Sequence, residues 1–227
     1  MKIEMARLGS ALRLDRAWKS AGPHALRRPF SADWARAVCA YARTPSRATW
    51  TWARSPAQRL EPLVEDLVSA LQDRDLPQDL PTSVEVHDVG PVQAGPLQVR
   101  GAVMSALSQA LGAVLEPHHP KLVVTVRGDA DGLLIGEDLA GSLTHRGYRR
   151  PQQEAPLREH LAAQMVALSS WRPSEEPLVD PMCGSGTILA EAHGWAHGVP
   201  VTRSGRWTSA QPAFLRPEPP PRWEESW

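Results

Sequence analysis

The sequence predicts an α/β fold, made of one compact module followed by a second, shorter one. Strand-like and helix-like patterns alternate between residues 55 and 142, and a strand, a glycine turn and a helix follow between 177 and 195. Hydrophobic residues make up 42% of the 227 residues, which is enough to bury a core. We therefore divide the chain into a basic N-terminal segment, two folded parts and a proline-rich tail, at 1–54, 55–142, 143–197 and 198–227.

The first elements are two helices separated by a strand. Residues 31–43 are predicted to be a helix, because Ser31 is a suitable N-cap and Trp34, Val38 and Tyr41 recur on one face. Alternating Thr and Trp predict a strand over 47–53. After Pro56, apolar residues recur at the helical period as far as Leu71.

A strand, a helix and a hairpin complete the first module. Valines between 84 and 89 indicate a strand, and apolar residues at four-residue steps predict a helix over 97–115. The β-branched run 122–126 is a strand that a glycine-containing turn at 128–132 connects to a second strand, 133–139.

The shorter part begins with a helix from about Pro156, a residue suited to the first helical position. Residues Leu157, Leu161, Met165 and Leu168 are expected to form the buried stripe of that helix. Residues 177–180 predict a short buried strand, and 188–195 a further helix.

Charge is distributed unevenly along the chain. Residues 1–59 hold twelve Lys or Arg against three Asp or Glu, although the whole chain is neutral. This basic segment favours a surface that faces a polyanion; the alternative is a set of solvated arginines. The chain shows no signal-peptide pattern and no apolar run long enough to cross a membrane, so we expect no membrane partner and a cytoplasmic protein. Its two cysteines are too few for a disulfide scaffold.

The segment 178–187 carries the most specific chemistry. It places Gly184 and Gly186 in a tight turn between a strand and a helix, where free backbone amides and a positive helix end can meet a ligand. Asp180 would lie at the carboxyl end of the strand, where open α/β sheets bind ligands. A dinucleotide loop would need glycine where Leu189 stands, and a phosphate loop would need lysine before Thr187. A turn without a ligand is the remaining alternative.

Three ordered segments, at 138–149, 155–163 and 180–187, resemble the bacterial large-subunit ribosomal RNA guanine-N2 methyltransferases that carry a THUMP domain. The string Asp-Pro-Met-Cys-Gly-Ser-Gly-Thr at 180–187 resembles their first S-adenosylmethionine motif. Residues 138–149 resemble the stretch that closes the THUMP domain, and 155–163 the helix before the first sheet strand. The resemblance implies a THUMP-like α/β module that binds RNA, followed by the incomplete start of a Rossmann-like class I methyltransferase domain. It also implies that the N-terminal segment is part of the family's ferredoxin-like subdomain.

The resemblance implies two sets of site residues. The cofactor S-adenosyl-L-methionine would be bound by Asp180, Met182, Cys183, Gly184, Ser185, Gly186 and Thr187. Ribosomal RNA would be contacted by His145, Arg146, Tyr148, Arg149 and Arg150. The alternative for the second set is a basic linker that pairs with Glu154 and Glu159.

The chain departs from the family where catalysis is concerned. The family holds the target guanine amine with an Asn-Pro-Pro or Asp-Pro-Pro loop that is followed by an aromatic residue; this sequence has no asparagine and no Asp-Pro-Pro. The catalytic residues are therefore unknown, and we expect a fragment of an RNA methyltransferase whose remainder a second polypeptide could supply. The alternatives are an RNA-binding protein without enzymatic activity and a decayed, poorly folded product. We expect no metal, since His193 and His197, four residues apart, have no third ligand.

Overall fold

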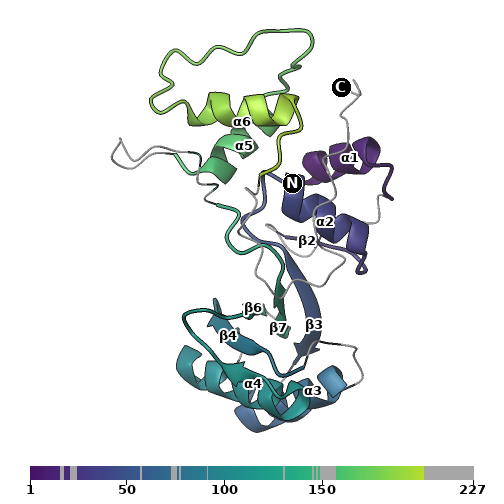
Figure 1. Ribbon diagram of the computed structural model, residues 1–227, viewed down its shortest axis with the longest axis vertical. Helices are drawn as coiled ribbons and strands as arrows, with labels where there is room; N and C mark the ends of the chain where they lie inside the picture. The colour runs from purple at the N-terminus through teal and green to yellow at the C-terminus, as the bar shows by residue number, and fades with distance from the viewer. Residues whose placement is uncertain are drawn as a thin grey trace. The chain divides into compact units, whose positions relative to one another are not determined.

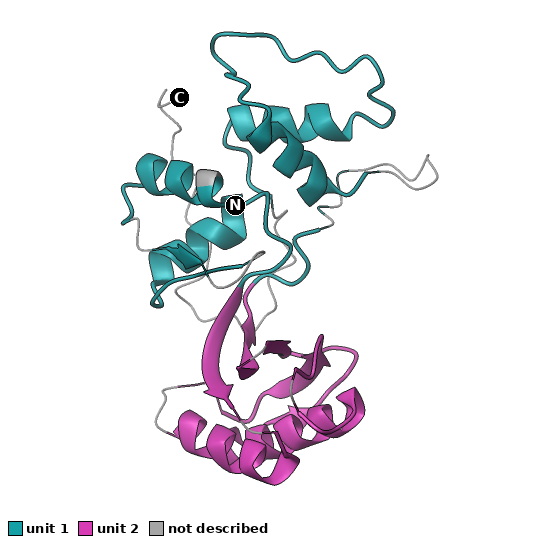
Figure 2. Cartoon of the chain, turned by 180° about the vertical axis from the view of Figure 1, so that it is seen from behind, with its two compact units in different colours: residues 1–48, 140–207, 212–227 teal, residues 49–139, 208–211 magenta. Residues whose placement is uncertain are grey.

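The chain forms two compact units in the computed structural model (Figure 2). The first unit combines residues 1–48 with residues 140–201, and the second unit spans Thr49–Leu139. The structure describes residues 1–15, 18–20, 25–56, 58–72, 76, 78–90, 92–129, 131–144, 146, 148 and 157–201. Within these ranges no helix is both long enough and apolar enough to cross a membrane.

The second unit is built on a five-stranded mixed sheet. Its spatial order is β3-β7-β6-β4-β5. Strand β4 is parallel to β5 and β6, whereas β7 is antiparallel to both β6 and β3. The strand bounds are Thr49–Ser55 (β3), Pro81–Val86 (β4), Val114–Leu115 (β5), Leu122–Asp129 (β6) and Gly132–Asp138 (β7). The strands predicted at 47–53, 122–126 and 133–139 and the hairpin β6–β7 are thus confirmed, whereas the strand predicted between 84 and 89 covers 81–86 instead.

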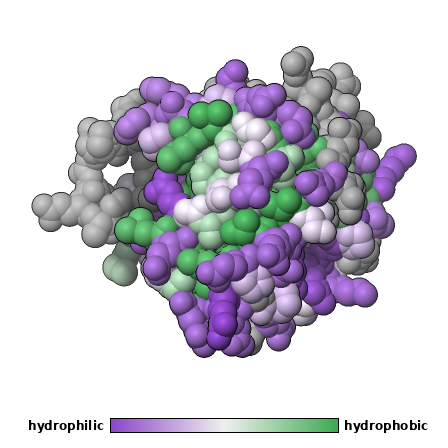
Figure 3. Space-filling view, turned by 90° about the horizontal axis from the view of Figure 1, so that it is seen from below, coloured by the Kyte–Doolittle hydropathy of each residue, from purple (hydrophilic) through white to green (hydrophobic). Residues whose placement is uncertain are grey.

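Two helices complete the second unit, α3 (Leu60–Gln72) and α4 (Pro96–Leu111), and they pack against each other and against the sheet (Figure 1). Leu63, Leu67 and Leu71 of α3 are fully buried, as their period predicts. The prediction that the second helix continues to residue 115 is wrong. The helix ends where Gly112 adopts a left-handed conformation (φ +63°), and the next residues pair with β4 instead. Figure 3, which views the molecule from the α3 and α4 end, shows hydrophobic residues lying among hydrophilic ones on this face.

The N-terminal part of the first unit packs around Trp34. Helix α1 (Lys2–Ala11), a two-stranded hairpin of β1 (Lys19–Ser20) and β2 (Leu26–Arg27), and helix α2 (Ala32–Tyr41) surround this side chain. Ser31 caps α2 as predicted, because its hydroxyl accepts a hydrogen bond from the Trp34 amide at 3.4 Å. The sequence did not predict α1 or the hairpin, since their apolar patterns are short.

The C-terminal part of the first unit consists of α5 (Glu159–Leu168) and α6 (Thr187–Ala196), which pack together. Backbone hydrogen bonds join this part to the N-terminal part: the Val201 amide donates to the Ala40 carbonyl at 2.7 Å, and the Leu143 amide to the Ser46 carbonyl at 2.9 Å. Helices α1, α2, α5 and α6 therefore belong to one packed body.

The apolar stripe predicted to be buried on α5 lies on its exposed side. Leu161, Met165 and Leu168 are 39%, 50% and 74% exposed, and Leu157, just before the helix, is 38% exposed. The buried face is instead formed by Ala162, Ala163 and Val166, which meet α6 and its surroundings. The prediction failed because it assumed a sheet next to this helix, and among the described residues the first unit has only the small hairpin β1–β2. Pro156 lies outside the described residues.

Candidate functional site

The glycine bend at residues 180–187 precedes α6 and faces solvent. Residues 177–180 form no strand, which contradicts the predicted buried strand. Val179 is 78% exposed and Met182 is 90% exposed. A strand needs a hydrogen-bonded neighbour, and no described segment pairs with this one.

Two glycines give the bend its sharp turn. Gly184 and Gly186 have φ values of +53° and +71°, a region that side chains with a Cβ rarely occupy. Gly186 is the N-cap of α6, and open space lies where its Cβ would be. The first hydrogen bond within α6 is donated by the Ala190 amide to the Gly186 carbonyl, at 2.8 Å. The amides of residues 187–189, in the first turn, therefore have no partner inside the helix. The bend thus presents backbone donors at the positive end of a helix.

Asp180 provides the negative charge of the bend. One of its carboxylate oxygens accepts a hydrogen bond from the Met182 amide at 3.1 Å, which closes the turn. No cation pairs with this carboxylate among the described residues. The carboxylate therefore remains available to a positively charged ligand group.

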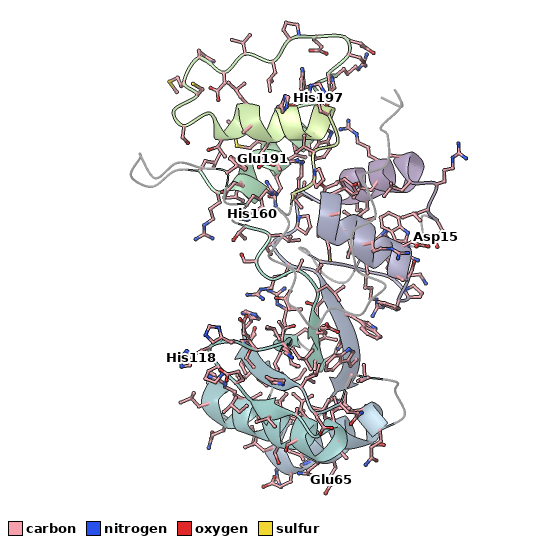
Figure 4. All side chains as sticks on the ribbon, in the orientation of Figure 1. Asp15, Glu65, His118, His160, Glu191 and His197 are labelled. Carbon is pink, nitrogen blue, oxygen red and sulfur yellow. The ribbon has the colours of Figure 1, made fainter. Side chains whose placement is uncertain are left out.

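A buried cluster of charges lies on the inner side of α6 and centres on Glu191 (Figure 4). Glu191 has no exposed surface. One oxygen lies 2.9 Å from a guanidinium nitrogen of Arg43; the other accepts a hydrogen bond from the Tyr148 hydroxyl at 2.7 Å and forms an ion pair with Arg146. The carboxylate therefore joins α6 to the end of α2 and to the segment after residue 140.

Arg43 is the second centre of this cluster. Its guanidinium also donates to the Val199 carbonyl, and Arg146 donates to the Arg43 carbonyl. Burial lowers the pKa of Arg43, and the nearby Glu191 carboxylate opposes this shift. Glu4 of α1 accepts the Arg43 amide at 2.5 Å and the Thr44 amide at 3.0 Å. Burial raises the pKa of Glu4 despite these bonds.

The residues predicted to contact RNA divide into two groups. Arg146 is 7% exposed and paired with Glu191, so in this arrangement it is not available to an RNA phosphate. Tyr148 is half-buried and donates to the same carboxylate, and burial is the main cause that raises its pKa. His145, Arg149 and Arg150 lie outside the described residues. For Arg146 the structure agrees better with the alternative, a basic linker that pairs with acids, although the acid is Glu191 rather than Glu154 or Glu159.

A small cleft of about 40 Å³ lies at the far end of α6 from the bend. It is lined mainly by apolar atoms of α1 and α6, and Arg7 stacks over the Trp195 ring at 5.1 Å. A volume of this size holds two or three waters at most, so the cleft is too small for a nucleoside.

The remaining candidates behave as surface residues. Cys183 is exposed, and the rings of His193 and His197 lie 4.4 Å apart on the outside of α6. No group of three metal ligands occurs within the described ranges. Sequence reasoning missed Glu191 and Arg43, because their 148-residue separation leaves no local signal of a pair.

A family model matches the part of the chain that contains the bend. Residues 146–211 match the family described as "RMKL-like, methyltransferase domain". This range contains the glycine bend, α5, α6 and the Glu191 carboxylate. Over 181 residues, or 75% of this chain, the sequence is 33% identical to the ribosomal RNA large subunit methyltransferase K/L of Alteromonas mediterranea. Over 103 residues it is 44% identical to the protein of the same name from Aliivibrio salmonicida.

The chain is shorter than these proteins. It spans about a quarter (26%) of the length of the first relative and 14% of the second.

Solved structures share the fold. The chain aligns over 95% of its length with a methylase structure from Clostridium difficile, covering 58% of that chain (TM-score 0.75, 24% identity). It aligns over 93% of its length with SMU.472, crystallised as a complex with SAH and assigned to the methyltransferases, covering 59% of that chain (TM-score 0.68, 23% identity). At this identity the likeness concerns the fold alone. The chain thus has a mixed α/β fold with a central sheet, contains a segment related to the RMKL-like methyltransferase domain, and is similar in sequence to ribosomal RNA large subunit methyltransferases.

Proposed function

We propose that this chain carries the cofactor-binding start of an S-adenosylmethionine-dependent RNA methyltransferase. The observation that carries the proposal is the glycine bend, where two left-handed glycines expose the first amides of α6 beside an unpaired carboxylate. The bend lies in the segment that matches the methyltransferase family, and a structural neighbour was crystallised with SAH.

The residues of the bend suit this cofactor. The first-turn amides of α6 and the Gly184–Gly186 backbone offer donors for the ribose and the methionine carboxylate, while Asp180 offers an acceptor for the amine. The open space beside Gly186 lets a ligand approach the backbone. When bound, the cofactor supplies an electrophilic methyl group. Met182, Cys183 and Ser185 are exposed at the same bend, and Thr187, which is buried, begins α6. We propose these four residues as further contacts.

We propose RNA as the substrate, and guanine N2 of 23S ribosomal RNA as its reacting group, because the relatives are ribosomal RNA large subunit methyltransferases. On this view residues 55–142 are a THUMP-like module that binds RNA. The remaining predicted RNA contacts are His145, Arg149 and Arg150. The protein would work in the cytoplasm, where the ribosomal RNA of a bacterium is found.

Methyl transfer needs residues beyond these 227. The sequence has neither asparagine nor Asp-Pro-Pro, so the loop that holds a target amine in the resembling family is not among them. The exposed stripe of α5 and the unpaired segment 177–180 are what an additional parallel sheet would cover. We therefore propose that further strands, from a longer chain or a second polypeptide, pack here and complete the cofactor pocket.

Isothermal titration with S-adenosylmethionine tests the cofactor assignment. We expect weak binding to this chain, and Asp180→Ala should weaken it about ten-fold or more, because a hydrogen bond to a charged group is lost. Glu176→Ala removes the same charge from an exposed position nearby and should have little effect. Loss of affinity in both variants, or in neither, would contradict a specific contact by Asp180.

No binding of the cofactor at all, together with salt-dependent binding of RNA, would favour an RNA-binding protein without enzymatic activity. The strongly basic segment 1–48, with ten Lys or Arg against three Asp or Glu, is the observation that favours this second candidate.

A further inference from the structure

The N-terminal segment, residues 1–48, has an excess of positive charge that its acids do not balance. Each of its three acids is already engaged: Glu4 is buried against the amides of Arg43 and Thr44, Asp15 is paired with Arg28, and Asp33 with Arg36. Four exposed cations then have no acidic partner among the described residues, namely Lys2, Arg13, Lys19 and Arg27.

Two of these cations stand side by side on the β1–β2 hairpin. Lys19 and Arg27 are direct cross-strand partners, so their side chains project from the same face, roughly 5 Å apart at the Cβ atoms. Like charges in this position destabilise a hairpin, and no acid offsets them in the described part of the chain. An anion that bridges both side chains would remove the repulsion.

The hairpin is held firmly from its other face. Trp18 and Leu26 pack on the core around Trp34. Arg28 lies over the rings of Trp18 and Trp34, at 5.7 Å and 5.3 Å. It also donates two hydrogen bonds to the Asp15 carboxylate, at 3.0 Å and 3.1 Å. Alternation along the strands therefore buries one face and presents Lys19 and Arg27 on the other in a fixed geometry.

The second unit has the opposite charge. Residues 49–139 contain six Lys or Arg and thirteen Asp or Glu. One of these six cations, Arg54, already pairs with an acid, Asp129, at 2.7 Å. A net negative charge of this kind gives the second unit less electrostatic attraction for a phosphate backbone than the N-terminal segment has.

We infer that the outer face of the β1–β2 hairpin, with Lys19 and Arg27, is a docking surface for the phosphate backbone of RNA. On this inference the N-terminal segment, rather than the acidic second unit, supplies most of the electrostatic attraction. The contact positions the RNA without reading its sequence. The inference rests on the proposed function for the choice of RNA.

The salt dependence of RNA binding tests the inference on the full chain. A fluorescent RNA stem-loop and a DNA duplex of equal length would be titrated between about 50 and 200 mM salt. Lys19→Ala with Arg27→Ala should reduce the magnitude of the negative slope of log K against log salt by about 1.4 to 1.8. The same double substitution should weaken RNA binding at low salt on the order of ten-fold. Lys19→Arg with Arg27→Lys keeps both charges and should retain the original slope.

Lys121→Ala with Arg127→Ala is the matched control, because it removes one exposed Lys and one exposed Arg from the second unit. An equal fall in slope in this control would overturn the inference, as would an unchanged slope in the hairpin variant or an absence of RNA binding. Tighter binding of DNA than of RNA would overturn the choice of partner. Cofactor titration on the same samples separates the two proposals. If S-adenosylmethionine still binds in an Asp180-dependent way while the hairpin variant keeps the original salt slope of RNA binding, the hairpin surface is refuted and the cofactor site is not.

Discussion

The packing of the first unit depends on one buried carboxylate. Glu191 holds two guanidinium groups and a tyrosine hydroxyl in a site without solvent. Removing one member of such a cluster is costly, because the charges left behind remain buried without compensation. The cluster therefore stabilises the first unit only while all its members are present.

Glu191→Gln should lower the free energy of unfolding of the first unit by about 3 to 5 kcal/mol. Gln has nearly the same shape but cannot balance Arg43 and Arg146. Urea unfolding followed by tryptophan fluorescence measures the change. Glu175→Gln is the control, since its ion pair with Arg172 (2.7 Å) is exposed and worth at most about 1 kcal/mol. A difference of less than 1 kcal/mol between the two variants would show that the cluster is not a main source of stability.

Glu137 makes the stability of the second unit depend on pH. It is 2% exposed, and in the sheet it stands between Trp50 of β3 and Val124 of β6. Burial, helped by the neighbouring Asp138, raises the pKa of Glu137 from 4.5 to about 7. The folded state therefore prefers the protonated form, and stability is lost as the pH rises from about 4.5 through 7.

We expect Glu137→Gln to stabilise the second unit at pH 8 by up to about 3 kcal/mol, and to change little at pH 4. Unfolding midpoints measured at both pH values provide the comparison. Glu65→Gln, at an exposed position of α3 in the same unit, should leave the pH profile as it is. If Glu137→Gln retains the wild-type decline between pH 5 and 7, another group titrates there.

At the scale of elements, close packing between α6 and the end of α2 depends on a glycine. A Cβ at Gly194 would lie 2.2 Å from a guanidinium nitrogen of Arg43, whereas a Cβ at Gly101 of α4 would meet nothing within 4 Å. Both glycines lie inside helices, where alanine is intrinsically favoured. The same substitution should therefore have opposite effects at the two positions.

Gly194→Ala should destabilise the first unit by about 1 to 3 kcal/mol, because Arg43 must leave its place beside Glu191. Gly101→Ala should stabilise the second unit by roughly 0.5 to 1 kcal/mol. Chemical denaturation of the two variants side by side provides the measurement. Stabilisation by Gly194→Ala would mean that Arg43 has room to move.

The helices and strands that the sequence predicted correctly are those whose packing partners are present in the described part of the chain. Helices α2, α3, α4 and α6 and the hairpin β6–β7 were predicted because each meets its own part of the core with a regular period. The buried strand at 177–180 and the buried stripe of α5 were wrong, since both assumed a sheet that the described residues do not provide. In the site, the glycine bend followed from local sequence, whereas the Glu191 cluster depends on contacts between distant segments.

At the scale of the whole molecule, the second unit carries its own core. Residues 49–139 include the five-stranded sheet, α3, α4 and a continuous apolar cluster. We expect a protein of residues 49–139 alone to fold and to unfold in one cooperative transition. Circular dichroism and thermal denaturation would show it. A broad, non-cooperative melt would mean that this unit needs the rest of the chain.

The first unit is discontinuous in sequence, and the pairing of β3 with β7 explains how it tolerates this. Thr49 and Asp138 are direct partners, so the chain enters and leaves the second unit through adjacent strands. An inserted unit whose two ends are adjacent can be removed or exchanged, because a tight turn is long enough to reconnect the two parts of the first unit. Recombination between related genes at these two points would therefore exchange the second unit, and the two parts of the first unit would still be able to pack together.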